Sequence, residues 1–220
     1  MEISRNPSKL SVSPASSMGL IVGPREAVKT GGQLLTLNGN HEIMNIEGDF
    51  RYVTEKGLEE FDVWAYCVRA RIAALRPNGP ISRRFLANNS TVLVVGDSVF
   101  VHGGLLAKHV DYGLQRINEE VRDWINGSKG GRAPEYCRGR NAVVWLRKFS
   151  DELEKNCDCS LLEHVLATIP GAKRMIMGHT IQVAGINGVC DSRAIRIDVE
   201  CRKAAVMDCL KFWRLIRTRG

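Results

Sequence analysis

The sequence contains no long hydrophobic run. None of its apolar stretches approaches the ~20 residues that a membrane-spanning helix needs, so we expect no membrane segment. Repeats and low-complexity tracts are also missing. Of the 220 residues, 44% are hydrophobic and 25% are charged, which argues against a disordered chain and suits one soluble domain with a sizeable core.

Regular cysteine spacing and a secretory signal are lacking too. Seven cysteines are scattered along the chain, which indicates a reducing compartment rather than a disulfide framework. Cys157 and Cys159 form an isolated C-x-C pair, interpreted as a surface turn near a helix start in preference to a metal or redox site. The expected compartment is cytoplasmic. Mitochondrial and plastid locations are the alternatives, because residues 1–24 are serine-rich with one acid and form either a disordered leader or a transit peptide.

More than half of the excess positive charge lies at the C-terminal end. The formal net charge is +7, and residues 200–220, with six basic and two acidic residues, account for more than half of it. The rest of the chain has no basic stripe interleaved with aromatic residues of the kind that binds nucleic acid. We therefore expect no nucleic-acid partner, and binding through the tail ranks last among the functions considered.

Short apolar runs alternate with helical patterns after residue 90. Runs that are β-branched and bounded by glycine or aspartate predict strands at 34–37, 91–95, 99–101, 174–177 and 195–199. Gly96 and Asp97 predict a hairpin turn. Helical spacing predicts a helix over 112–125, and Ser160 with Glu163 predicts a capping box for a second helix that stops before Pro170. This alternation indicates an α/β layered fold.

Three of the five histidines directly follow predicted strands. His41 lies between Asn40 and Glu42 after an apolar run, and His102 and His179 follow the strands at 99–101 and 174–177. Because polar site residues gather at strand ends in layered α/β folds, we expect these turns to converge. Imidazole and amide oxygen are suitable ligands for zinc, manganese or iron. Four glycines are expected to provide positive φ or close backbone approach nearby: Gly39, Gly103, Gly104 and Gly178.

The same residues resemble the signature motifs of a known enzyme family. Three segments match, in order, the later motifs of metallophosphoesterases of the phosphoprotein phosphatase type: Asn38-Gly39-Asn40-His41-Glu42, Val101-His102-Gly103-Gly104-Leu105 and Gly178-His179-Thr180. Longer stretches are similar to the plant branch of the Shewanella-like protein phosphatases: 37–52, 94–106, 117–127 and 174–190. The resemblance covers most of 25–199.

The resemblance implies an αββα metallophosphoesterase sandwich of the calcineurin-like superfamily, acting on phosphorylated Ser, Thr or Tyr residues of proteins. In this family two divalent metals (Mn, Fe or Zn) activate water for in-line attack on phosphorus. By position, Asn40, His102 and His179 correspond to ligands of the second metal, and His41 to the general acid that protonates the leaving oxygen. Arg147 corresponds to a phosphate-binding arginine, with Arg140 as a rival for this role.

Several family features are missing. The motifs GDxHG and GDxxDRG, which supply the first-metal ligands and the bridging aspartate, do not occur, and no aspartate or histidine precedes His41. With one amide and two imidazoles, at most one metal is expected to bind, and weakly. Phosphomonoester hydrolysis is therefore expected to be weak or lost, and the alternative is a non-catalytic remnant that binds a phosphopeptide or partner. The sandwich would be incomplete at its N-terminal side, leaving 34–37 as an open sheet edge.

Two breaks in the resemblance define the expected domain boundaries. Between Trp64 and Val68 the chain has three residues where family members have a longer segment. After Val199 the family continues GMSKGC, and codons for that segment read one base later give the residues found at 200–204. We therefore expect a leader at 1–24, a partial metallophosphoesterase domain at 25–199 and a frameshifted tail at 200–220.

Overall fold

The computed structural model describes residues 2–4, 29, 34–54 and 67–199. Most of the predicted leader, the break after Trp64 and the predicted tail lie outside the described residues. The strands are β1 (Glu2–Ser4), β2 (Leu34–Thr36), β3 (Val92–Val95), β4 (Ser98–Val101), β5 (Arg174–Met177), β6 (Asn187–Val189) and β7 (Ala194–Arg196). The helices are α2 (Asn40–Glu47), α4 (Cys67–Leu75), α5 (Ala107–Tyr112), α6 (Leu114–Ile125) and α7 (Cys159–Ala167), with short turns η1 (Ser82–Leu86), η2 (Glu135–Cys137) and η3 (Glu154–Asn156).

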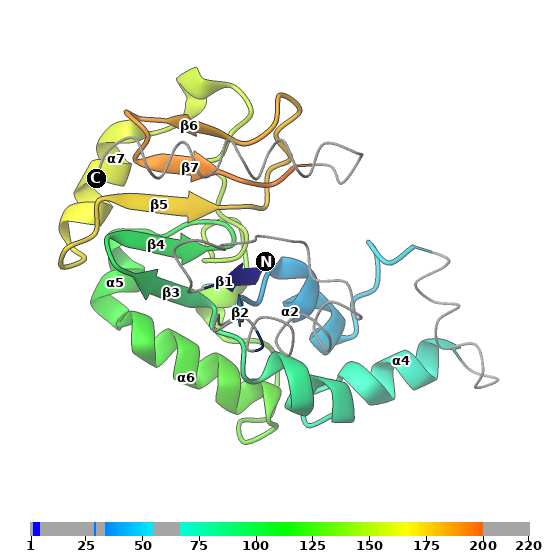
Figure 1. Cartoon of the computed structure of the whole chain (residues 1–220). Helices are drawn as coiled ribbons and strands as arrows, with labels where there is room; N and C mark the ends of the chain where they lie inside the picture. The colour runs from blue at the N-terminus through cyan, green and yellow to red at the C-terminus, as the bar shows by residue number, and fades with distance from the viewer. Residues whose placement is uncertain (1, 5–28, 30–33, 55–66, 200–220) are drawn as a thin grey trace.

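A mixed five-stranded sheet forms the centre of the fold, in the order β3-β4-β5-β7-β6 (Figure 1). β4 and β7 both run parallel to β5, whereas β3 and β6 pair antiparallel to β4 and β7 at the two edges. The hairpin predicted at Gly96 is confirmed: Val95 pairs with Ser98, and Gly96 has a φ of 59°. Because β4 and β5 are neighbouring parallel strands, the residues that follow them lie next to each other at the same end of the sheet.

The central strands are buried on both faces, which is why their sequences are continuously apolar. On one face, Val99, Val101, Met175 and Met177 pack into the larger core with α6. On the other face, a smaller cluster contains Leu37, Phe100, Ile176, Ile195 and Ile197. The predicted α/β fold class is confirmed.

The second sheet is small in the described part of the chain. Only β1 and β2 form it, as an antiparallel pair. Leu37 then makes a parallel bridge to Ser90. The prediction of an open sheet edge at 34–37 is therefore wrong in part, because β2 pairs with β1 and Leu37 is bridged to Ser90.

Helix boundaries differ from the predictions where capping decides them. The helix predicted over 112–125 begins at Leu114, because Gly113 with a φ of 106° separates it from α5. The capping box predicted from Ser160 and Glu163 is wrong. Asp158 is the N-cap of α7, and its carboxylate accepts a hydrogen bond from the Leu161 backbone N–H at 3.0 Å. Among the described residues, no helix is both long and apolar enough to cross a membrane.

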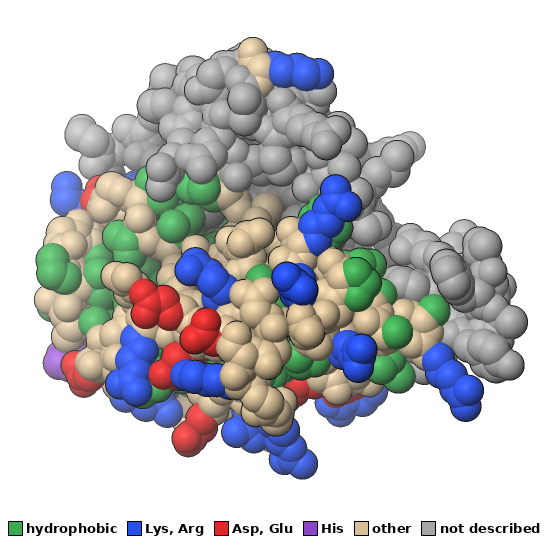
Figure 2. All heavy atoms as spheres, turned by 90° about the horizontal axis from the view of Figure 1, so that it is seen from below, with side chains coloured by type: hydrophobic (Ala, Val, Ile, Leu, Met, Phe, Trp, Pro, Cys, Tyr) green, Lys and Arg blue, Asp and Glu red, His purple; other side chains and the backbone are tan. Residues whose placement is uncertain are grey.

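The surface on the α6 side carries both signs of charge. Figure 2 shows acidic and basic side chains interspersed on this face, without a continuous basic area. Helix α6 contributes to this mixture with Arg116, Glu119, Glu120 and Arg122, while Ile117, Val121 and Trp124 face the core.

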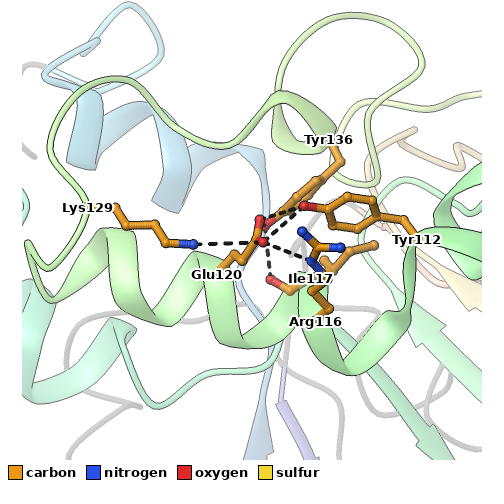
Figure 3. Close-up of polar contacts among 6 residues, drawn as sticks. All are labelled: Tyr112, Arg116, Ile117, Glu120, Lys129 and Tyr136. Atoms are coloured by element: carbon orange, nitrogen blue, oxygen red, sulfur yellow. Dashed lines mark hydrogen bonds and ion pairs between the residues drawn. The ribbon is translucent and has the colours of Figure 1, made fainter.

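Glu120 ties α6 to its neighbours (Figure 3). Its carboxylate accepts hydrogen bonds from the hydroxyls of Tyr112 and Tyr136 and from Arg116, and Lys129 Nζ lies 3.8 Å away. Burial opposes ionisation, but the hydrogen bonds and the charge of Lys129 outweigh it, so the pKa of Glu120 is lowered. The cluster joins the end of α5, the middle of α6 and the turn η2.

Replacing Glu120 by glutamine is expected to lower the free energy of unfolding by about 1 kcal/mol at neutral pH, since charged hydrogen bonds are lost at a partly exposed site. The folded pKa is depressed, so this contribution is present above the unfolded pKa and disappears as pH falls through the folded value, below 4.5. Urea denaturation at neutral and acidic pH measures it. Glu119→Gln is the matched control on the same helix, and an equal loss for both variants would contradict the expectation.

Candidate metal and phosphate site

The first site residue is delivered by the start of α2. Asn38 is buried and fixed on both sides: its backbone N–H donates to Ser90 O at 2.9 Å and its side-chain amide to Leu86 O at 3.1 Å. Gly39 caps the helix, and its N–H donates to the Glu42 carboxylate at 2.8 Å. The segment 40–42 is therefore helical rather than the turn expected from the sequence, and Glu42 serves as a cap.

Asn40, His102 and His179 converge, as the sequence predicts. Asn40 Oδ1 lies 2.6 Å from His102 Nε2 and 3.2 Å from His179 Nδ1. The two imidazole rings meet edge to face, with centroids 5.1 Å apart. The asparagine comes from α2, and the histidines follow the parallel strands β4 and β5. Two ring nitrogens from distant parts of the sequence thus lie within hydrogen-bonding distance of one amide oxygen.

Close packing around the histidines restricts the neighbouring glycines. A Cβ on Gly39 would lie 2.9 Å from His102 Nδ1, so only glycine fits there without moving the ring. Gly104 has a positive φ of 153°. The expectation is wrong for Gly178, where a Cβ would find ordinary contacts at 3.6 Å. His179 itself takes the left-handed conformation, with a φ of 67°.

Both histidines are held in the neutral form. Burial lowers the pKa of His179 to about 4, with Arg147 and His41 acting in the same direction and the Trp145 carbonyl opposing them. Burial and the neighbouring His179 lower the pKa of His102 well below its ordinary value. Neutral imidazole is the form that binds a metal. The described residues contain no group of three or more His, Cys, Asp or Glu suited to a metal, so the donor set is the amide oxygen and the two rings.

Arg147 lies beside this cluster. Its Nη1 donates to the His179 carbonyl at 2.9 Å and to Thr180 Oγ1 at 2.8 Å, while the side chain remains exposed. Thr180 Oγ1 also lies 3.0 Å from Ser150 Oγ. Arg140 is exposed on the preceding loop and makes none of these described contacts. The structure therefore brings Arg147, and not Arg140, to the histidines.

His41 lies on the exposed side of α2. Its ring stacks on Tyr52, with centroids 5.5 Å apart and an interplanar angle of 9°. Its charge lowers the pKa values of His179 and Asp198. The imidazole is thus close enough to influence the cluster electrostatically and is open to solvent.

Asp198, just beyond β7, was missed by the sequence reasoning. Burial raises the pKa of its carboxyl, while the His179 backbone N–H, His41 and Arg147 lower it. The carboxylate therefore belongs to the same cluster. The strand-end pattern that identified His102 and His179 did not point to Asp198, because the strand predicted at 195–199 includes it, whereas β7 ends at Arg196.

The cysteine prediction is wrong for one pair. Cys159, the first residue of α7, forms a disulfide with Cys190, 31 residues further on. Cys157 is buried without a disulfide, so the C-x-C pair is split between two roles. Cys190, Asp191 and Ser192 all have positive φ, and the disulfide joins this tight β6–β7 turn to α7.

Comparison with known proteins identifies the relationship. No protein-family model matches the chain. An Arabidopsis thaliana protein named Shewanella-like protein phosphatase 2 is 62% identical over 218 aligned residues, which include 81% of this chain and 56% of that protein. The chain belongs to the Shewanella-like protein phosphatase family. A Plasmodium berghei protein, Shewanella-like protein phosphatase 1, is 28% identical over 79% of this chain and 49% of its own length.

Solved structures support the fold of this Shewanella-like phosphatase chain. The cold-active protein tyrosine phosphatase of a psychrophilic Shewanella species superposes with a TM-score of 0.61 and 22% identity, over 80% of this chain and 52% of that one. The chain spans about half the length of each of these three relatives. Moreover, 81% of 220 residues is about 178, fewer than the 218 aligned positions, so the Arabidopsis protein has residues within this region that the chain lacks. A missing internal segment, as expected after Trp64, would produce such a difference.

Proposed function

We propose that Asn40, His102 and His179 bind one divalent metal ion of the Mn, Fe or Zn type, as part of a protein phosphatase site. The observation that supports this proposal is the convergence of both imidazoles on Asn40 Oδ1, at 2.6 and 3.2 Å. Such an ion, when bound, lowers the pKa of water and polarises a phosphate. The family supplies the substrate class, phosphomonoesters on proteins, because the relatives are named protein phosphatases.

The surrounding residues have separate roles in this proposal. Arg147 is anchored through Nη1, and its other guanidinium nitrogens, which make no hydrogen bond to the described residues, are proposed to hold phosphate oxygens. His41, exposed beside the cluster, donates a proton to the leaving oxygen.

Activity of this chain is proposed to be weak or lost. All three ligand atoms are neutral, so nothing among them offsets the dehydration of a dication. The sequence also has no aspartate or histidine before His41 to supply a second metal site. A single metal would stabilise only one side of the transferring phosphate. In-line displacement is fastest when metal ions stabilise both the attacking and the leaving oxygen.

Titration with Co²⁺ tests the proposed site. One equivalent is expected to bind, with visible absorption from nitrogen and oxygen ligands, and His102→Ala is expected to abolish binding because one of two imidazoles is lost. His164→Ala, on the exposed face of α7, is the matched control and should bind as the wild type does. Turnover of p-nitrophenyl phosphate with Mn²⁺ should be slow and lost in His41→Ala. Equal Co²⁺ binding by all variants would exclude this site.

A second candidate is a non-catalytic module that binds a phosphopeptide. The exposed and anchored Arg147 favours it, because this role needs no metal. Arg147→Ala is expected to weaken binding of a phosphoserine peptide by roughly 10-fold or more, the loss of one charged hydrogen-bonding group. Fluorescence anisotropy measures this, with Arg140→Ala as the control variant and the unphosphorylated peptide as the control ligand. If Arg140→Ala has the larger effect, the phosphate assignment belongs to Arg140.

A further inference from the structure

Two large aliphatic side chains are exposed beside the proposed phosphate site. Ile181 is 50% exposed and Val183 is 82% exposed, and both belong to the loop that follows β5 and His179. The other large hydrophobic side chains exposed among the described residues lie singly along the chain. Single exposed apolar residues are common in any protein, whereas a pair on one short loop next to a polar site is the arrangement expected where a partner binds.

The residue between the two aliphatic side chains fixes the loop. Gln182 is buried, and its backbone N–H donates to Asp198 O at 2.7 Å. Its side-chain amide donates to Ser150 O at 3.1 Å and to Thr180 O at 2.9 Å. The residues on either side of Gln182 are therefore displayed to solvent from an anchored backbone. Such a loop has little conformational freedom left to lose when a ligand binds.

The same loop is continuous with the groups proposed to hold phosphate. Arg147 Nη1 donates to Thr180 Oγ1 at 2.8 Å and to His179 O at 2.9 Å. Ile181 directly follows Thr180 in the chain. Successive residues of an extended peptide advance by about 3.3–3.6 Å. A residue one or two positions away from a phosphorylated residue held by Arg147 is therefore within reach of Ile181 and Val183.

The chemistry of the loop defines the kind of peptide that fits. The stretch 181–189 contains no charged residue, so it offers no ion pair to acidic or basic side chains beside the phosphorylated residue. Aliphatic side chains of a peptide would instead gain free energy by covering apolar surface on this loop.

We propose that Ile181 and Val183 select the substrate, by binding aliphatic side chains next to the phosphorylated residue of a protein segment. This inference rests on the proposed function, because it takes Arg147 as the group that holds the phosphate. It adds a substrate class: phosphorylated segments with aliphatic neighbours, in preference to those with polar neighbours.

Two peptides test the proposal by fluorescence anisotropy, one with phosphoserine between leucines and one with phosphoserine between serines. The wild type is expected to bind the leucine peptide about 10-fold more tightly, the order expected when one or two aliphatic side chains are covered. The double variant Ile181→Ser/Val183→Ser is expected to lose this preference. Its urea midpoint should match the wild type, because both positions are exposed. Val94→Ser, exposed on the edge strand β3, is the matched control and should keep the preference.

Unphosphorylated copies of both peptides separate this inference from the proposed function. Equal affinity of the wild type for the leucine and serine peptides overturns the selection by aliphatic residues, even if phosphate strengthens binding. A preference that survives in the double variant also overturns it, since other residues then provide the contact. If phosphate adds nothing to binding while the leucine preference depends on Ile181 and Val183, the phosphate role of Arg147 fails and the aliphatic contact stands. If no peptide binds, both are overturned.

Discussion

Reduction of the Cys159–Cys190 disulfide is expected to lower the free energy of unfolding by about 3–4 kcal/mol. The cross-link closes a loop with a sequence separation of 31, and removing it restores the conformational freedom of that loop in the unfolded chain. The same loop contains β5, the strand at the centre of the sheet. For a chain of this size, the loss corresponds to a decrease in melting temperature of roughly 6–15 °C.

Urea denaturation with and without a reductant measures the effect. The double variant Cys159→Ser/Cys190→Ser is the control: it should match the reduced wild type and show no response to the reductant. Metal binding should change little. Because β6 runs antiparallel to β7, and β7 is parallel to β5, Cys190 follows β6 at the end of the sheet away from His179. An oxidised wild type whose urea midpoint is insensitive to reductant would show that the disulfide contributes no stability.

The sheet could be predicted from the sequence because its central strands are apolar on both faces. The runs at 99–101 and 174–177 contain almost no polar residues, and their short length and β-branched or glycine-bounded composition favour buried strands. Once these strands are parallel neighbours, the histidines that follow them must meet. The convergence of His102 and His179 therefore follows from local patterns and a single topological rule.

Helix α2 could not be predicted in the same way. It has eight residues, which is too short for a clear amphipathic period. Its N-cap residue, Gly39, has no side chain and therefore gives no capping signal in the sequence. The helix is stabilised by the return bond from Glu42 and by burial of Ile43, Met44 and Ile46. Only tertiary packing reveals that Asn40 starts a helix rather than a turn.

Contacts between residues far apart in the sequence could not be predicted either. Cys159 pairs with Cys190 because the β6–β7 turn reaches α7, and Asp198 reaches His179 because β7 pairs with β5. Neither approach leaves a spacing signal in the sequence. The strand-end rule identified the histidines but did not select Asp198, because the predicted strand at 195–199 extends past it and β7 ends at Arg196.

Gly103→Ala is expected to destabilise the fold by about 3 kcal/mol and to disrupt the site, since close packing leaves no space for the added methyl group. A Cβ there would lie 2.7 Å from Leu146 N, 2.8 Å from Trp145 N and 2.9 Å from Val143 O. All three are backbone atoms, so a side-chain rotation cannot relieve the contact. Gly103 N also donates to Val143 O at 2.9 Å, which keeps the two segments together.

The displacement would act on the site from two directions. Gly103 follows His102, a proposed metal ligand. It packs against the segment 143–146, which leads directly to Arg147. If the added methyl group pushes these two segments apart, His102 and Arg147 also move apart. Co²⁺ affinity is therefore expected to fall together with stability, by roughly 10-fold or more. Gly130→Ala is the matched control, because a Cβ at Gly130 meets no atom within 4 Å. If Gly103→Ala has the stability and the Co²⁺ affinity of the wild type, the prediction is wrong. The segments that carry His102 and Arg147 would then not be packed closely against each other.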